Sequence, residues 1–231
     1  LLALRWSGAA AGRALRFGLP LLPHALAAIA MVQADRFLIG QQLGLDEAGI
    51  YAVAMQLALP VVIVADSLNR AFTPWLYREL SEGDRDIALA VSALGVAGAI
   101  VGTALLVGIA FACVPIILGD RFAEAAGLLI WLGPAVAAQA AYYIFVNFIF
   151  YSERNGLIPV VTGSAALAYV GFGYLAVQHY GAFGLATVYS LVSLVQTVAI
   201  FWVARTVFPM PWFSRAAYSR GFRFIGARLW S

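Results

Sequence analysis

Two Asp–Arg pairs stand inside long apolar stretches of this chain. Asp35 and Arg36 are adjacent in the first stretch, and Asp66 precedes Arg70 by four residues in the second. A charged side chain at the centre of a bilayer costs about 3 kcal/mol or more, so these groups require partners, water or a ligand. The four-residue spacing places Asp66 and Arg70 on one helix face, where they can form an ion pair. These charges predict the polar interior of a polytopic membrane protein and are the first candidates for function.

Further polar side chains recur at helical spacing along the apolar stretches. Steps of three or four residues place His24 on one stripe with Asp35, and Gln56 on another with Arg70. Two more stripes are formed by Gln139, Tyr143 and Asn147, and by Ser190, Ser193 and Thr197. Each stripe has two interpretations: it lines an internal cavity, or it serves helix packing and reaches toward the headgroups. Packing is the preferred interpretation for the last two stripes.

The elements that must position these residues are membrane-spanning helices. The chain has 231 residues, of which 63% are hydrophobic and 11% charged, whereas soluble domains are about half apolar and one quarter charged. A hydrocarbon core of about 30 Å requires about 20 residues per helix, so this length allows about six spans. The predicted spans are 17–43, 48–70, 87–118, 123–151, 157–178 and 182–205. We expect an all-α, six-helix transmembrane bundle over 1–208.

The arginines are distributed unevenly between the two predicted sides of the membrane. Twelve of the 14 fall on the side that holds both ends of the chain, and only Arg36 and Arg121 fall on the other. Positive residues flanking spans remain cytoplasmic, so both ends are expected in the cytoplasm. The basic charge therefore indicates orientation rather than nucleic-acid binding. In the tail, 209–231, arginines alternate with aromatic residues, a mixture that favours the membrane surface; a disordered tail is the alternative.

Sequence motifs for catalysis and metal binding are absent. The chain contains no HExxH, no phosphate-binding glycine loop with Lys, no GxSxG, and only two histidines, His24 and His179. Its one cysteine, Cys113, lies in an apolar run and is interpreted as packing. We therefore expect no enzyme activity, no cofactor and no metal site. The chain begins without Met, from which we expect a piece of a longer protein.

Four segments near the start carry a family resemblance. They are FGLPLLPHAL (17–26), ADRFLIG (34–40), LGLDEAGIYAVA (43–54) and NRAFTPWLYREL (69–80). They resemble the oligosaccharide flippases of bacterial polysaccharide biosynthesis, in the superfamily that also holds the lipid II flippase and the multidrug and toxin extruders. In that family such a block opens the second half of a longer, two-bundle protein. The resemblance thus implies a C-terminal half whose N-terminal bundle is missing here.

The resemblance implies a transporter that moves a lipid-linked oligosaccharide to the periplasmic leaflet of the inner membrane by alternating access, for exopolysaccharide or lipopolysaccharide. An undecaprenyl-pyrophosphate-linked sugar needs guanidinium groups for its phosphates and amides or aromatic rings for its hydroxyls. Arg36 and Arg70 are candidates for the first role. Asp35 would pair with and orient an arginine, and Asp66 is a further candidate for substrate binding beside Arg70. Candidates for the second role are Gln33, Gln56, Gln139, Tyr143 and Asn147.

Alternatives remain open at this point. An ion-coupled multidrug exporter would favour an acid-dominated cavity, whereas the charges inside these spans balance. A non-transporting scaffold of a polysaccharide assembly complex would not depend on these charges at all. Coupling to protons through His24 or Asp66 is a further hypothesis, because both titrate within spans. Expected partners are membrane lipids, a polysaccharide polymerase and glycosyltransferases.

Overall fold

The structure is a computed structural model that describes residues 22–82, 85–119 and 122–229, with five isolated positions before them (8, 12, 15, 18 and 19). The described part is helical and contains no strand. In chain order its elements are α2 (Leu22–Gln42), α3 (Leu45–Glu82), α4 (Arg85–Leu118), α5 (Ala123–Tyr151), the 3₁₀ turn η3 (Asn155–Leu157), α6 (Ile158–Val207) and α7 (Arg215–Leu229). The expectation of an all-α protein is confirmed.

Four of the described helices are long and apolar enough to cross a membrane: α3, α4, α5, and α6 together with η3. The chain is therefore a membrane protein by the length and composition of its helices. The expectation of six separate membrane-spanning helices is not confirmed. Two differences account for this: α2 is not among the four, and one long helix, α6, replaces the two predicted spans 157–178 and 182–205.

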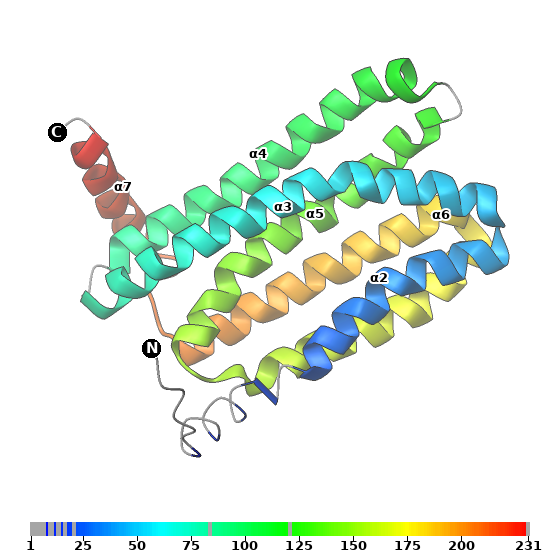
Figure 1. Cartoon of the computed structure of the whole chain (residues 1–231). Helices are drawn as coiled ribbons and strands as arrows, with labels where there is room; N and C mark the ends of the chain where they lie inside the picture. The colour runs from blue at the N-terminus through cyan, green and yellow to red at the C-terminus, as the bar shows by residue number, and fades with distance from the viewer. Residues whose placement is uncertain are drawn as a thin grey trace, which may run out of the picture.

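α6 doubles back on itself at Gly181, where the backbone leaves the helical region with φ 62° and ψ −151°. The rings of Tyr169 and Tyr189 contact each other at 5.3 Å between centroids, although twenty residues of straight helix would separate them by about 30 Å. A positive φ is accessible to glycine without steric cost, which explains why the turn falls at this residue. α6 is thus a hairpin of two antiparallel arms, visible in Figure 1 as the yellow and orange ribbons.

α3 extends well beyond the predicted span 48–70. It continues through Pro74 to Glu82, and its 38 residues correspond to about 57 Å of helix. The segment after Arg70, which was expected to leave the span, therefore remains part of the same helix. Prolines inside membrane helices are tolerated because neighbouring groups compensate for the lost backbone hydrogen bond.

α5 lies at the centre of the bundle and packs against α3, α4 and α6, while α2 packs mainly on α6 (Figure 1). Small residues allow close approach of these helices. A Cβ atom at Gly95 of α4 would lie 2.8 Å from Ile144 Cδ1 of α5, and one at Gly133 of α5 would contact Thr103 of α4 at 3.5 Å. The core is therefore built around α5, which carries the largest set of buried residues.

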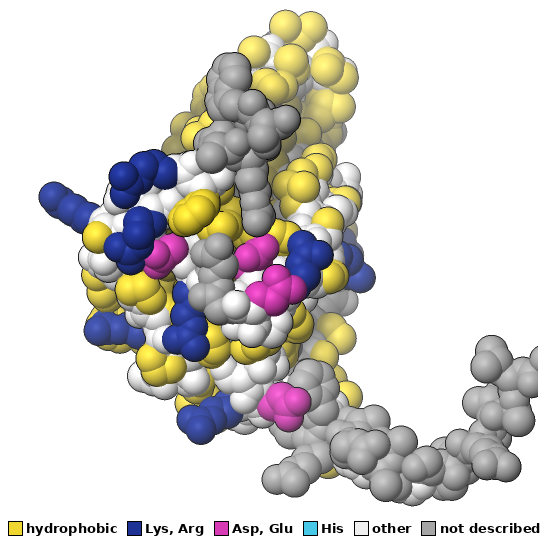
Figure 2. Space-filling model, turned by 90° about the vertical axis from the view of Figure 1, so that its left-hand side faces the viewer, with side chains coloured by type: hydrophobic (Ala, Val, Ile, Leu, Met, Phe, Trp, Pro, Cys, Tyr) yellow, Lys and Arg dark blue, Asp and Glu magenta, His cyan; other side chains and the backbone are white. Residues whose placement is uncertain are grey.

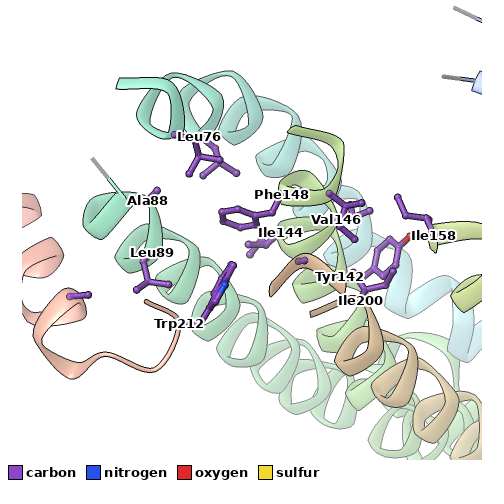
Figure 3. Close-up of a cluster of buried hydrophobic side chains, with 14 residues drawn as sticks. Leu76, Ala88, Leu89, Tyr142, Ile144, Val146, Phe148, Ile158, Ile200 and Trp212 are labelled. Carbon is purple, nitrogen blue, oxygen red and sulfur yellow. The ribbon is translucent and has the colours of Figure 1, made fainter. Parts of the chain in front are cut away.

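The tail forms an ordered helix, α7, that packs against the beginning of α4. Before it, the chain folds back and buries the Trp212 side chain, which is only 5% exposed. Figure 3 shows Trp212 between Leu89 of α4 and Phe148 of α5, and its ring lies 4.9 Å from that of Phe148. The Arg220 Nε lies 2.6 Å from the Asp86 Oδ2. The tail is thus docked on the bundle, and its position at the membrane surface stays a prediction.

Arginines gather at one end of the bundle. The turn between α3 and α4, the turn between α5 and α6, the end of α6 and α7 all lie at this end, and they carry Arg78, Arg85, Arg154, Arg205, Arg215, Arg220 and Arg223. Figure 2 views this end, where dark blue side chains surround a few acidic ones. Arg36, in contrast, lies on α2 near its turn into α3, at the opposite end. Within the described residues, the arginine asymmetry expected from the sequence is present in the fold.

Candidate functional site

A cavity of about 460 Å³ lies between α2, α3, α5 and α6. Five of the residues selected from the sequence line it: Asp35, Arg36, Gln56, Gln139 and Tyr143. They come from three helices, and Gln139 and Tyr143 share a face of α5 because they are four residues apart. These five residues bring one guanidinium group, one carboxyl group, two amides and a phenol to the cavity.

Asp35 is the most buried charged residue of this site, with 3% of its surface exposed. Its carboxylate accepts a hydrogen bond from the Tyr169 hydroxyl, across the contact between α2 and the first arm of α6. Tyr51 and Tyr189 also lie close to it. The resemblance implied an arginine as the partner of Asp35, and the structure instead provides a tyrosine. A buried carboxylate is stabilised by hydrogen-bond donors when no cation is available.

Arg36 differs from Asp35 because it is exposed while it still lines the cavity. Its neighbour along the chain is the buried carboxylate, yet no ion pair with Arg36 occurs among the described residues. The five N–H donors of a guanidinium group are suited to bidentate binding of phosphate oxygens. This arrangement leaves Arg36 available for an anionic ligand.

The second arm of α6 contributes polar lining that the sequence analysis missed or assigned to packing. Ser193, Gln196 and Thr197 all line the cavity. The Thr197 hydroxyl donates to the Ala138 carbonyl at 3.0 Å, so this residue serves packing as well. Gln196 was not selected at all, although its three-residue step from Ser193 continues that stripe. This step was the only sequence signal that pointed to Gln196.

Asp66 and Arg70 form the expected ion pair, with 2.8 Å between the Arg70 Nε and the Asp66 Oδ2. The prediction of this pair is confirmed, but neither residue lines the cavity. Their side chains are 38% and 79% exposed, and they lie near Tyr143, the last residue of α5 to line the cavity. The pair thus stands toward the arginine-rich end, while Arg36 stands toward the opposite one.

Two other selected residues are not brought into the cavity, and a third lies outside the described part of the structure. Asn147 is buried, and its Nδ2 donates to the Asn69 Oδ1 at 2.8 Å, which connects α5 to α3. Gln33 is exposed outside the cavity. The side chain of His24 lies outside the described part of the structure. The hypothesis of proton coupling through His24 therefore stays a prediction.

Comparison with known proteins gives the family. A family model described as "Polysaccharide biosynthesis protein" matches residues 2–127, which include α2, α3 and α4. A protein of the Lsg locus of Haemophilus influenzae is 32% identical over 158 residues, which are 68% of this chain and 39% of that protein. The chain thus spans well under half the length of this curated relative. No solved structure matches.

The matched residues contain the segments on which the resemblance was based, together with Asp35, Arg36 and Gln56 of the cavity. The assignment to the second half of a longer protein is a separate matter and stays a prediction. By its sequence over more than half of its length, this chain is a member of the polysaccharide biosynthesis protein family.

Proposed function

We propose that this chain is part of a flippase that moves a lipid-linked oligosaccharide across the bacterial inner membrane by alternating access. The observation that carries the proposal is the cavity that α2 forms with three membrane-length helices, where Arg36 lines the same space as amide and hydroxyl groups. A pyrophosphate-linked sugar combines an anion with many hydroxyls. Guanidinium groups bind phosphate oxygens, and the amides of Gln56, Gln139 and Gln196 offer both donors and acceptors to a sugar.

The geometry supports six membrane crossings, with two of them from the arms of α6. Residues 158–180 and 182–207 form these arms, and at 1.5 Å per residue each exceeds the hydrocarbon thickness of about 30 Å. α2, with 21 residues, reaches about 32 Å and would supply another crossing. With the arginine-rich end in the cytoplasm, both ends of the chain would be cytoplasmic.

Alternating access requires a second bundle against which this one can move. In the proposed transporter, the remainder of a longer protein faces the cavity and completes it.

Arg36 and the Asp66–Arg70 pair stand toward opposite ends, so they would meet the phosphates at different stages of their passage. Glycosyltransferases and a polymerase would supply and consume the lipid-linked sugar. A scaffold without transport activity is the alternative that the experiment must exclude.

The test is translocation of a lipid-linked oligosaccharide by full-length protein in proteoliposomes, together with surface polysaccharide in cells. Arg36→Ala should lower translocation by about tenfold or more, because a charge-assisted hydrogen bond contributes about 1.5–3 kcal/mol. Arg36→Lys should retain part of it, since the charge remains but the bidentate geometry is lost. Arg223→Ala is the matched control, because Arg223 is exposed on α7, away from the cavity.

Membrane insertion and thermal stability of each variant are measured in parallel. Normal translocation by Arg36→Ala would remove Arg36 from the site. Normal surface polysaccharide after replacement of both Arg36 and Gln139 would favour the scaffold. A wild-type protein that translocates no lipid-linked sugar would overturn the proposed function itself.

A further inference from the structure

The second arm of α6 carries an exposed apolar stripe that ends in a tryptophan and an arginine. Leu191, Val195 and Val198 are each more than half exposed, and steps of four and three residues place them on one helix face. Trp202, which is 50% exposed, continues this stripe, and Arg205 follows it in the last turn of the helix. A face that changes from aliphatic residues to Trp and then to Arg is typical of a helix that passes from hydrocarbon into the headgroup layer.

The stripe lies on the side of the arm that faces away from the polar cavity. Ser193 lines the cavity, and Trp202 follows it by nine residues, which at about 100° per residue places the two on opposite sides of the helix. Tyr189, which also lines the cavity, is related to Val198 by the same step. A ligand inside the cavity therefore does not contact the stripe, whereas membrane phospholipid does.

The length of the arm places Arg205 at the depth of lipid phosphates. The chain reverses at Gly181, and the 24 residues from there to Arg205 correspond to about 36 Å of helix. The hydrocarbon core is about 30 Å thick. With the reversal in one headgroup layer, Arg205 lies in the opposite one, at the arginine-rich end of the bundle.

The Arg205 guanidinium is held between two aromatic rings. Its central carbon lies 4.8 Å from the centre of the Trp202 ring and 5.0 Å from that of Phe213. Such contacts engage the faces of the planar group and leave the N–H groups at its edge for hydrogen bonds. No carboxylate among the described residues forms an ion pair with Arg205. We refer to Trp202, Arg205 and Phe213 as the Arg205 cradle.

The charge around the Arg205 cradle favours an anionic partner. The described acids at this end of the bundle are Glu79, Glu82, Asp86 and Glu153, fewer than its seven arginines (Figure 2). Asp86 is already paired with Arg220. An excess of arginine beside a membrane attracts anionic lipids of the cytoplasmic leaflet.

We propose that the Arg205 cradle binds the phosphate group of an anionic phospholipid of the cytoplasmic leaflet. The guanidinium donates to the phosphate oxygens, and the acyl chains lie along the apolar stripe of α6. Phe213 stands just before α7 and is 68% exposed, so the bound lipid links the end of α6 to the segment that leads into α7. The lipid is a structural ligand that stays in its leaflet, which makes this inference independent of transport through the cavity.

The test is lipid binding to the full-length protein in detergent, followed by native mass spectrometry, with phosphatidylglycerol as the probe and phosphatidylcholine as the zwitterionic comparison. The wild type should bind phosphatidylglycerol more tightly. Arg205→Ala should lower that affinity by about tenfold or more, because the charge-assisted hydrogen bonds to phosphate are lost. Arg205→Lys should retain part of it, since the charge remains without the planar fork. Arg154→Ala is the matched control, because Arg154 is exposed at the same end and contacts no aromatic ring among the described residues.

Phe213→Leu keeps every charge and removes one ring of the cradle, so it repeats the test if Arg205→Ala fails to fold. It should lower the affinity for phosphatidylglycerol by about threefold. Equal losses in Arg205→Ala and Arg154→Ala would show a diffuse attraction of charges and overturn the inference. Equal affinity of the wild type for both lipids would overturn it, as would displacement of the lipid by inorganic phosphate at the same concentration. Translocation by Arg36→Ala is measured separately, so failure of this inference leaves the proposed function untouched.

Discussion

The Tyr169 hydroxyl donates a hydrogen bond to the carboxylate of Asp35, across 134 positions of sequence and between two helices. Both side chains are buried, with 3% of Asp35 and 0% of Tyr169 exposed. The bond gives the buried carboxylate a donor other than the adjacent Arg36, for which no ion pair occurs among the described residues. It also fixes α2 against the first arm of α6.

Tyr169→Phe should destabilise the protein without altering the cavity wall, because Tyr169 does not line it. Loss of the donor leaves a buried carboxylate without its partner, at a cost of about 1–3 kcal/mol. Thermal unfolding in detergent measures the effect. Tyr174→Phe is the control, since Tyr174 is on the same arm but 48% exposed. In the double variant with Asp35→Asn the two losses should not add, and full additivity would mean that the hydrogen bond contributes nothing.

Gln139 and Asn147 should respond differently to alanine, although they belong to one stripe of α5. Gln139 lines the cavity, so Gln139→Ala should lower translocation and leave stability near wild type. Asn147 is bonded to Asn69 of α3, so Asn147→Ala should cost about 0.6–1.7 kcal/mol of stability, the range of hydrogen bonds between membrane helices. Unfolding and translocation assays on both variants check this. The reverse pattern would place the ligand at the α3–α5 contact.

Gln139 and Asn147 show what helical periodicity alone can and cannot predict. The stripe was visible in the sequence because helical spacing defines which residues share a face. Helical spacing does not define which neighbouring helix packs on that face. In this fold α3 crosses α5 close to Asn147 but leaves space at Gln139. The same limit applies to Asp66 and Arg70, whose ion pair depends only on local spacing and was predicted correctly. Their position outside the cavity depends on how α3 packs and was not predictable.

Local signals also located the turn of α6 but not the length of α3. Gly181 falls in the gap between the predicted spans 157–178 and 182–205, and the chain reverses there. In α3, a charged segment after Arg70 and a proline at 74 indicated an end, yet the helix continues to Glu82. Packing of Tyr77 on Tyr151, with 5.3 Å between ring centroids, supports this extension. Such contacts between distant segments are not readable from hydropathy.

Gly221→Ala should release α7 from the bundle. A Cβ atom at this position would clash with the Asp86 carbonyl oxygen, a backbone atom that cannot rotate away. Overpacking of this kind costs about 1–3 kcal/mol, so trypsin should cleave α7 at Arg220 and Arg223 about fivefold faster or more. Gly98→Ala is the control, because nothing lies within 4 Å of that position. Equal cleavage of both variants would show that α7 is not held at Gly221.

The two turns at opposite ends of α6 should be accessible from opposite sides of the membrane. Glu153 is exposed before the first arm, and Tyr180 is 76% exposed at the reversal. Because the arginines gather at the Glu153 end, that end should be cytoplasmic. In a cysteine-free background, an impermeant maleimide should label Tyr180→Cys in intact cells, and Glu153→Cys only after permeabilisation. Ser214→Cys, before α7, should behave like Glu153→Cys. Labelling of all three only after permeabilisation would mean that α6 does not cross the membrane twice, which would contradict the six proposed crossings.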